Sequence, residues 1–262
     1  MDAEQERIYL IKYMLAERNA SSEIPQDEYS QRRLLRALFN TRLPMPVGEE
    51  FLRVQDDYLK ARRETAGVTD ISELTPVSGA PDLYLWRGDI TTLKCDGIVN
   101  AANSELLGCF HPNHGCIDNA VHTFAGVQLR AECDAIMRAQ GHSEPTGGAK
   151  LTRGYNLPCK YVLHTVGPIV YGALRREHEE QLASCYRSCF ELAYKNGLES
   201  LAYCCISTGE FMFPAERAAK IAVDTVLDCK RRLNSGMKIV FNVFKESDRE
   251  IYSKLLGAIV GA

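Results

Sequence analysis

The chain has 262 residues and a formal net charge of -3, with 45% hydrophobic and 25% charged residues. This is ordinary globular usage, and the length allows one large domain or two smaller ones. The slightly acidic balance argues against a broad nucleic-acid surface, which needs a basic face. The sequence contains no run of the ~18–20 apolar residues that a membrane-spanning helix requires. We therefore expect neither nucleic acid nor a membrane among the partners.

The cysteines indicate the compartment. The first 20 residues mix acidic and basic side chains into their apolar positions, so they do not resemble a signal peptide. Ten cysteines without a secretory signal favour a reducing environment, where such clusters more often bind metal or stay as buried thiols than form disulfides. We expect a cytoplasmic protein.

The N-terminal part predicts helices. Three sets of apolar residues recur there at helical spacing: Ile8, Ile11 and Leu15; Leu34, Leu35, Leu38 and Phe39; and Phe51, Val54, Tyr58 and Leu59. Cysteine and histidine are absent up to residue 94 and glycine is sparse up to residue 80, which places a boundary near 75–82. We expect an N-terminal helical extension at 1–80, packed on a second domain at 81–262. A partner-binding role for the extension is the alternative.

Beyond residue 82, short apolar strands alternate with helical stretches. The expected strands are Leu83–Trp86, Gly97–Val99, Tyr161–Thr165, Leu201–Ile206 and Lys238–Val243. The expected helices lie around 117–139, 177–196, 214–233 and 246–258. This alternation implies βαβ units and a mainly parallel or mixed sheet. Ligands of such sheets bind outside the carboxyl ends of the strands, so the residues after each strand are the candidate site.

Small and polar residues follow three of these strands, in the segments Asn100–Asn103, His164–Pro168 and Ser207–Phe211. The last segment leads to Pro214 at the start of a predicted helix, so its backbone amides can bind an anion without Lys or Arg. The sequence has neither the Walker A nor the Rossmann glycine pattern. We therefore expect an anion to be held here by backbone geometry.

The segment after the second strand carries a possible metal site. Cys109, His114 and Cys116 have the spacing C-x4-H-x-C, and zinc suits such mixed sulfur and nitrogen donors. Three protein ligands would leave the fourth position for water or substrate, as in catalytic sites. His111 competes with His114, but the C-x4-H spacing leaves more loop to surround an ion, so we favour His114. The alternative is a set of reduced, unligated cysteines.

Several segments in this order resemble the macrodomain family, whose members bind ADP-ribose. The matching segments are Gly88–Thr91, Asn100–Ser104, His164–Pro168, Ser207–Gly209 and Phe213-Pro214. The resemblance covers roughly 83–262. The cysteine and histidine insert further resembles the zinc-dependent macrodomain class, which removes ADP-ribose from modified proteins and carries an N-terminal helical extension. It implies an α/β fold, namely a three-layer α/β/α macrodomain with a central mixed sheet, preceded by that extension.

The resemblance also implies roles for individual residues. Asp89 corresponds to the acceptor for the adenine amino group, Ile90 contributes its backbone there, and Asn103 corresponds to the contact to the distal ribose. The loop that holds the pyrophosphate is made of Ser207, Thr208, Gly209, Glu210 and Phe211. Asp118 aligns with an aspartate of the family's hydrolases. The chain departs from the family where cysteines and His114 replace an all-glycine loop, and at Met212, where many relatives have glycine.

These assignments predict a zinc-dependent hydrolase that removes ADP-ribose from mono-ADP-ribosylated protein. Zn²⁺ is the expected cofactor, Asn103 would position the ribose, and Asp118 would orient or deprotonate the attacking water. One alternative is an ADP-ribose reader that binds without turnover. A second is a structural zinc module with four protein ligands, for example with His111 added. The open metal position together with Asp118 favours the enzyme.

Overall fold

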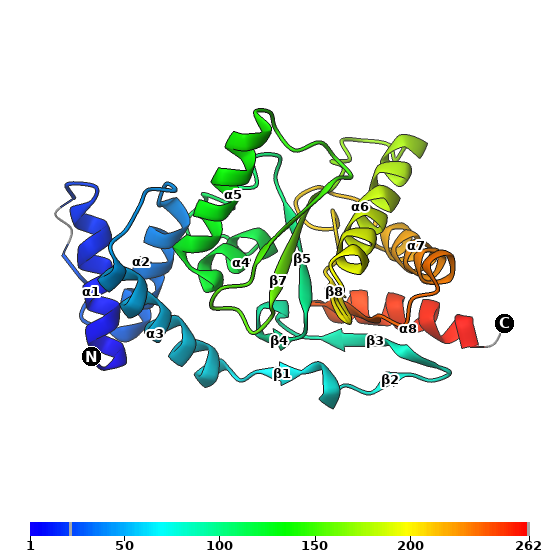
Figure 1. Ribbon diagram of the computed structural model, residues 1–262, viewed down its shortest axis with the longest axis horizontal. Coiled ribbons are helices and arrows are strands. Elements are labelled where there is room, and N and C mark those ends of the chain that lie inside the picture. The colour runs from blue at the N-terminus through cyan, green and yellow to red at the C-terminus, as the bar shows by residue number, and fades with distance from the viewer. Residues whose placement is uncertain (21–22, 261–262) are drawn as a thin grey trace.

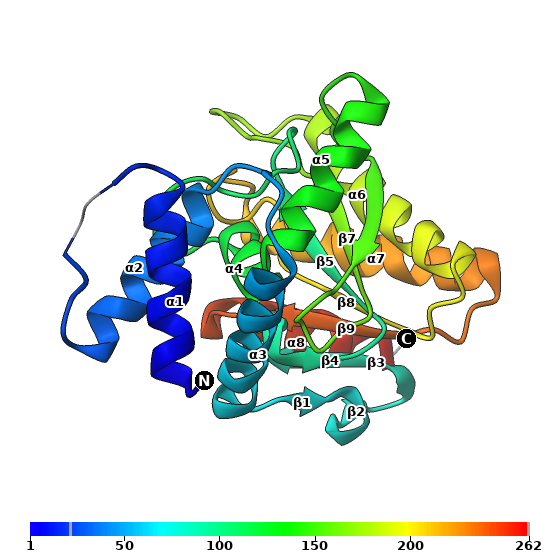
Figure 2. The same ribbon diagram turned by 60° about the vertical axis from the view of Figure 1, so that its left-hand side comes forward.

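The computed structural model describes residues 1–20 and 23–260. Residues 21 and 22 of the predicted extension, and 261 and 262 of the predicted second domain, lie outside the described residues. Figures 1 and 2 show a helical N-terminal part beside a larger α/β part. Each part has its own cluster of buried apolar side chains, so the two are separate cores in contact.

The helices of the extension are α1 (Ala3–Ala16), α2 (Glu28–Thr41) and α3 (Glu49–Ala66). Asp2 caps α1 by accepting hydrogen bonds from the amides of Glu4 and Gln5, and Asp27 caps α2 through the amide of Ser30. Apart from Ile8, the residues of the predicted apolar stripes belong to or pack against the shared core, which includes Ile11, Leu35, Phe51 and Val54. The three predicted helices are therefore confirmed.

Short strands connect the extension to the main sheet. β1 (Thr69–Asp70) pairs in parallel with β4 (Leu93–Lys94), and β2 (Pro76–Val77) pairs in antiparallel orientation with β3. A 3-10 turn, η1 (Ile71–Glu73), lies between β1 and β2. The helical part of the extension thus ends at Ala66, and the segment up to Val77 runs along the strands of the larger part.

The main sheet has seven strands within the described residues, in the order β2-β3-β9-β8-β5-β7-β6. The bounds are β3 (Ala80–Arg87), β5 (Gly97–Ala102), β6 (Ala149–Arg153), β7 (Tyr161–Val166), β8 (Ser200–Tyr203) and β9 (Lys238–Val243). The five inner strands from β3 to β7 are mutually parallel, and antiparallel β2 and β6 form the two edges. The sheet is mixed, as predicted.

Three details of the predicted strands differ. β5 continues to Ala102, while β8 ends at Tyr203 instead of Ile206 because the chain turns there into the loop that follows. β6 was not predicted, since its edge position leaves most of its side chains partly exposed and its sequence, Ala149–Arg153, is not an apolar run.

Helices cover both faces of the sheet (Figure 1). α4 (Ile117–Ala125) and α5 (Val127–Gln140) contact β5 and β6 on one face. On the other face lie α6 (Arg176–Lys195), α7 (Ala215–Leu233) and α8 (Glu246–Val260), packed side by side. The molecule therefore has the three layers that the sequence predicts.

The single helix predicted at 117–139 is wrong, because Gly126 divides it. Gly126 has φ +94°, which favours glycine, and a Cβ there would lie 2.7 Å from the side chain of Gln55. Gln55, in α3, accepts a hydrogen bond from the amide of Val127 at 2.9 Å and so caps α5. Gln55 of the extension thus helps to form the break between α4 and α5.

The extension is fastened to the larger part by buried polar contacts as well as by α2 packing on α4. Arg130 of α5, 5% exposed, donates hydrogen bonds to the carbonyls of Phe39 and Leu107 at 2.8 and 2.6 Å. Arg63 of α3 donates to the carbonyl of Asn156 at 2.9 Å. These contacts fix the position of α2 relative to the start of α4.

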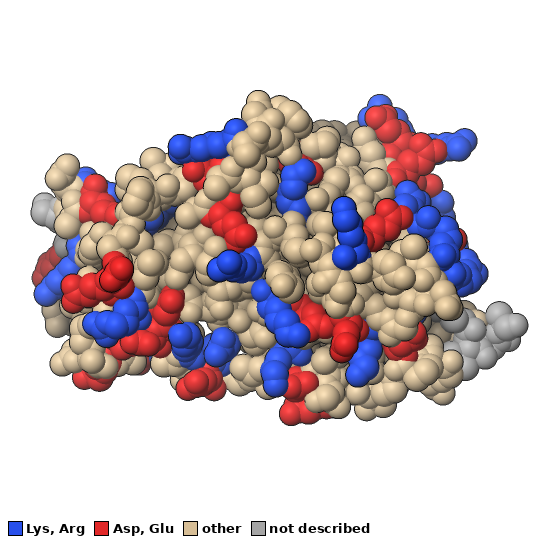
Figure 3. All heavy atoms as spheres, in the orientation of Figure 1, with Lys and Arg blue, Asp and Glu red and all other residues tan. Residues whose placement is uncertain are grey.

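On the face shown in Figure 3, acidic and basic side chains intermingle. Within residues 1–20 and 23–260, none of the helices combines the length and the apolar character needed to cross a bilayer.

Candidate active site

The predicted site residues gather at one edge of the sheet. Because the inner strands are parallel, their carboxyl ends meet at this edge. Asp89 follows β3, Asn103 follows β5, and the loop that contains Ser207 follows β8. Sequence positions more than 100 residues apart are therefore placed at one edge of the sheet.

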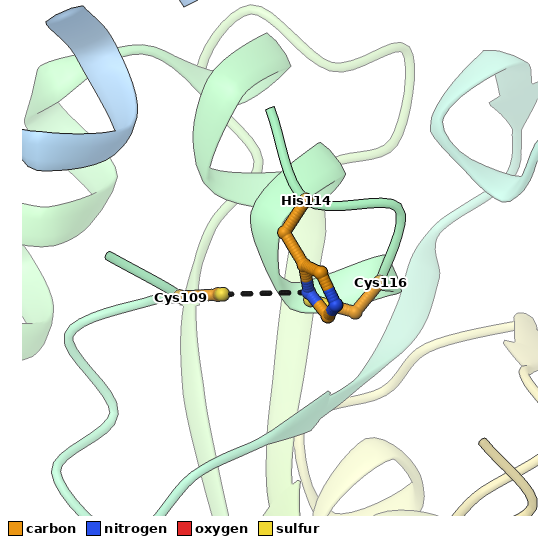
Figure 4. A group of neighbouring side chains, drawn as sticks. All are labelled: Cys109, His114 and Cys116. Atoms are coloured by element: carbon orange, nitrogen blue, oxygen red, sulfur yellow. Dashed lines mark hydrogen bonds between the residues drawn. The ribbon is translucent and has the colours of Figure 1, made fainter. Parts of the chain in front are cut away.

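The three predicted metal ligands are brought together. The ligand atoms of Cys109, His114 and Cys116 all lie within 4.8 Å of one another, and Figure 4 shows the side chains converging. The Cys109 Sγ is 3.6 Å from the His114 Nδ1. A tetrahedral zinc ion with ordinary bond lengths would place such a sulfur and nitrogen about 3.5 Å apart. The donor set and its spacing thus fit zinc.

His111, the competing imidazole, lies outside this group. Its ring centroid is 5.4 Å from that of His114, in an edge-to-face arrangement. Among the described residues, the group holds these three candidate ligands without a fourth Cys, His or carboxylate. This arrangement agrees with an open coordination position and gives no support to a closed structural site.

The start of α4 positions Cys116. Cys116 is the N-cap of the helix, and its Sγ accepts a hydrogen bond from the amide of Asn119 at 3.4 Å. Burial raises the pKa of the Cys116 thiol to about 12, with the neighbouring Cys109 adding to the rise against the lowering by the Asn119 amide. At neutral pH this thiol needs a cation to become a thiolate, because the charge is otherwise poorly solvated.

The metal loop meets the loop after β8. The His114 Nε2 lies 3.5 Å from Oε1 of Glu210. With Nδ1 turned towards Cys109, this geometry suits a ligand histidine whose other nitrogen faces a carboxylate, an arrangement that fixes the orientation of the ring. Glu210 therefore stands beside the metal ligands as well as in the predicted pyrophosphate loop.

Asp118 is a buried carboxyl at the first turn of α4, 4% exposed. Its Oδ1 accepts a hydrogen bond from Asn100 Nδ2 at 2.8 Å, and its Oδ2 lies 3.4 Å from Asn103 Nδ2. Burial raises the pKa of Asp118 to about 6, although the hydrogen bond from Asn100 and the charge of Arg130 oppose the rise. The two predicted catalytic residues, Asn103 and Asp118, are thus in contact.

A second group of histidine and cysteine side chains lies next to Asp118. His122, Cys133 and His164 are all buried, with ligand atoms within 4.8 Å of one another. His164 is held on both sides, by Asn100 at 3.1 Å and by the hydroxyl of Thr152 at 2.9 Å. Since Asn100 Nδ2 can only donate, His164 Nδ1 accepts and Nε2 carries the proton. This group is part of the core that supports Asn100.

The loop after β8 offers backbone amides, as predicted. Among the described residues, the amides of Gly209, Glu210 and Phe211 donate to no protein acceptor. The amide of Thr208 points instead to the carbonyl of Cys205, at 3.4 Å. Three consecutive free N–H groups ahead of α7 are therefore available to an anion. Ser207 shapes the loop with φ +64°, close against Gly167, where a Cβ would lie 2.0 Å from the Ser207 Oγ.

Asp89 and Ile90 lie at the end of β3. Asp89 is exposed and caps the short 3-10 turn η2 (Ile90–Thr92), accepting from the Thr91 amide at 2.9 Å through Oδ1. No hydrogen bond within the described chain engages its other oxygen, Oδ2, which can accept from a ligand. Ile90 is buried at 4% exposure.

Several residues of the site were not predicted. Asn100 was predicted only as one of the carboxamides at the end of the second strand. Nothing else in the sequence indicated its contact to Asp118. Asn119 holds the metal loop through the carbonyls of Cys109 and His111, at 3.3 and 3.0 Å. Contacts from α2 are also new, because they join residues about 80 positions apart, which a local pattern cannot reveal.

The comparisons with known proteins agree with this architecture. Residues 99–222 match the family model "Macro domain". The Trypanosoma brucei macrodomain solved in complex with ADP-ribose superposes with TM-score 0.66 at 32% identity, covering 85% of this chain and 95% of that one. The Oceanobacillus iheyensis macrodomain with ADP superposes with TM-score 0.62 at 35% identity, covering 68% of this chain and 92% of that one. The α/β part is a macrodomain, and the predicted fold class is confirmed.

Two curated relatives match this chain over nearly its full length. A protein-ADP-ribose hydrolase of Treponema medium is 55% identical over 260 residues, covering 98% of this chain and 100% of the relative. A protein-ADP-ribose hydrolase of Staphylococcus aureus strain Mu50 is 47% identical over 251 residues, covering 95% and 94%. The chain belongs to the macrodomain family of protein-ADP-ribose hydrolases.

Proposed function

We propose that this protein is a zinc-dependent hydrolase that removes ADP-ribose from mono-ADP-ribosylated protein side chains. The observation that carries the proposal is the convergence of Cys109, His114 and Cys116 at the edge of the sheet where the buried Asp118 lies. The full-length relatives named protein-ADP-ribose hydrolase support the reaction, and the solved macrodomain with ADP-ribose supports the ligand.

The groups at this edge of the sheet suit the successive parts of ADP-ribose. The exposed carboxylate of Asp89 accepts the adenine amino group, with the backbone of Ile90 beside it. The free amides of Gly209, Glu210 and Phe211 bind the pyrophosphate, which needs N–H donors more than full charges. Asn103 then positions the distal ribose, so that remote binding energy fixes the anomeric carbon.

Cys109, His114 and Cys116 would hold zinc with the fourth coordination direction open. Zinc bound there supplies Lewis acidity towards a ribose hydroxyl or a water molecule. The chain's own residues supply the rest of the site. The carboxylate of Asp118, held by Asn100 and next to Asn103, orients the attacking water and accepts its proton. Positive charge that develops on the ribose is also favoured by this carboxylate.

The experiment uses a protein that carries radiolabelled mono-ADP-ribose, prepared separately with acidic, serine and arginine linkages. The chain should release free ADP-ribose from at least one of them, a chelator should stop the release, and added zinc should restore it. Cys116→Ala should lose both zinc and release. Cys229→Ala, which removes a thiol of α7 outside the metal group, should keep both.

The outcomes separate the alternatives. Release that chelation leaves unchanged would keep the hydrolase and reject zinc. Tight ADP-ribose binding with every linkage left intact would reject the hydrolase and identify a reader.

A further inference from the structure

The α2 helix of the extension contacts the metal loop, residues 108–116. Two of its side chains one turn apart, Arg36 and Asn40, meet two side chains one turn apart on α4, Asn119 and Thr123. Residues four positions apart share a helix face, so α2 and α4 present matched polar pairs to each other. The metal loop runs beside this contact.

Arg36 holds two parts of the site at once. Its Nη2 donates to Oδ1 of Asn119 at 2.8 Å and to the carbonyl of His114 at 3.0 Å, and its Nε donates to the same Asn119 oxygen at 3.2 Å. A guanidinium can make these bonds together because its donors form a rigid planar fork. The backbone of a predicted metal ligand is therefore tied to the extension.

Asn40 holds the turn that precedes His114. It is fully buried, and its Oδ1 accepts a hydrogen bond from the amide of Asn113 at 2.9 Å. Its Nδ2 donates to the hydroxyl of Thr123 at 2.8 Å. Asn113 has φ +57°, a left-handed conformation that aims the chain into His114. The bond from Asn40 stabilises this turn.

Asn119 connects Arg36 to the rest of the metal loop. Its Nδ2 donates to the carbonyls of Cys109 and His111, and its amide donates to the Cys116 Sγ. Arg36 in turn occupies its Oδ1, which fixes the orientation of the carboxamide. The carbonyls of Cys109 and His114 and the Sγ of Cys116 are thus held by Asn119 and Arg36.

We infer that Arg36 and Asn40 are positioning residues for the metal ligands, so that the extension completes the metal site. This inference rests on the proposed function, because it takes Cys109, His114 and Cys116 as zinc ligands. A loop that already has the ligand geometry loses less conformational entropy when the cation binds. Removing groups that orient metal ligands typically lowers metal affinity by about 10–100-fold.

The experiment compares four full-length chains: wild type, Arg36→Ala, Arg36→Lys and Arg33→Ala. Arg33 is the matched control, an exposed arginine of the same helix whose guanidinium lies over the Tyr29 ring. Zinc affinity is measured by competition with a chromophoric chelator, and the geometry is followed by the absorption of bound Co²⁺. The melting temperature of each metal-free chain reports fold stability separately.

Arg36→Ala should bind zinc about 10-fold more weakly and change the Co²⁺ spectrum. Arg36→Lys, which lacks the fork, should recover only part of the affinity. Arg33→Ala should match the wild type. If Arg36→Ala lowers the metal-free melting temperature but leaves zinc affinity and the Co²⁺ spectrum unchanged, the extension is only a stabilising cover and the inference is wrong.

A second measurement keeps the inference distinct from the proposed function. In the metal-free chain, Asn40→Ala should speed hydrogen exchange across the metal loop by several-fold, since the Asn113 amide loses its acceptor. If the wild type binds no stoichiometric zinc, the zinc part of the proposed function fails, whatever the exchange shows. If the wild type binds zinc and neither Arg36→Ala nor Asn40→Ala changes affinity or exchange, only the inference fails.

Discussion

The metal loop and the loop after β8 offer different groups to a ligand. The metal loop, residues 108–116, offers side chains, and Asn119, Arg36 and Asn40 hold this loop in place. The loop after β8, residues 204–213, offers backbone amides. Short-range bonds shape most of it, such as Phe213 N–H to the Ser207 carbonyl at 2.9 Å, and the amide of Val170 adds a distant contact to the Phe211 carbonyl at 2.9 Å. The backbone groups are thus arranged mainly by local bonds, whereas the side chains of the metal loop depend more on distant elements.

The comparison predicts the largest effect at Asp118, whose side chain acts directly in the proposed reaction. Asp118→Asn keeps the shape and the contact to Asn100 but cannot accept a proton, so the hydrolysis rate should fall about 10²–10⁴-fold. Zinc content and ADP-ribose affinity should stay near the wild-type values. A variant that still hydrolyses at more than a tenth of the wild-type rate would remove Asp118 from the catalytic role.

The buried imidazole of His164 predicts that the free energy of unfolding depends on pH. Burial lowers the pKa of His164 from 6.5 to about 4, so folding favours the neutral ring. This stabilisation is fully present above pH 6.5 and is lost as the pH falls towards about 4. Between pH 7.5 and 5, the loss amounts to about 2 kcal/mol.

Urea unfolding of chelator-treated chains at the two pH values measures this loss. His164→Gln should reduce the acid-induced drop in the free energy of unfolding by about 2 kcal/mol. The exposed His142 is the control, and His142→Gln should leave the drop unchanged. Because Asp118 and His122 are present in every chain compared, the difference reports His164 together with its coupling to His122. Equal drops in wild type and His164→Gln would contradict the assignment of a buried neutral ring.

At the adenine end, Asp89→Ala should weaken ADP-ribose binding about 10-fold, or about 1.4 kcal/mol, because a charged acceptor is lost. Asp70 is the matched control: it caps the 3-10 turn η1 as Asp89 caps η2, accepting from Ser72 as Asp89 accepts from Thr91. Asp70→Ala should leave the affinity unchanged in isothermal titration. Equal losses in both variants would mean that the cap, and not adenine contact, is responsible.

The loop after β8 should tolerate a changed side chain at Glu210 but not an added side chain at Gly209. A Cβ on Gly209 would meet no atom within 4 Å beyond its chain neighbours, so Gly209→Val should fold normally. It should nevertheless weaken ADP-ribose binding several-fold, because the new side chain occupies the diphosphate space. Glu210→Gln keeps every amide and should change the affinity by less than about threefold. A larger loss for Glu210→Gln than for Gly209→Val would show that side chains, not amides, carry this loop.

The same contrast explains how much the sequence could predict. The alternating strands and helices, the ligand spacing of Cys109, His114 and Cys116 and the loop at Ser207 are local patterns. The structure brings the three ligands together and places the loop at the same edge of the sheet. Asn119, Arg36 and Asn40 could not be recognised, because their role depends on α2 packing against α4. The break at Gly126 was missed for the same reason, since Gln55 of α3 shapes it.

Anomalous diffraction at the zinc edge, from a crystal grown with zinc and ADP-ribose, tests the central claim most directly. The account predicts one peak about 2.3 Å from the two sulfurs and about 2.0–2.1 Å from His114 Nδ1, with its fourth direction towards the distal ribose. A peak with His111 or Glu210 as a fourth protein ligand, or a fully reduced triad with no peak, would contradict it.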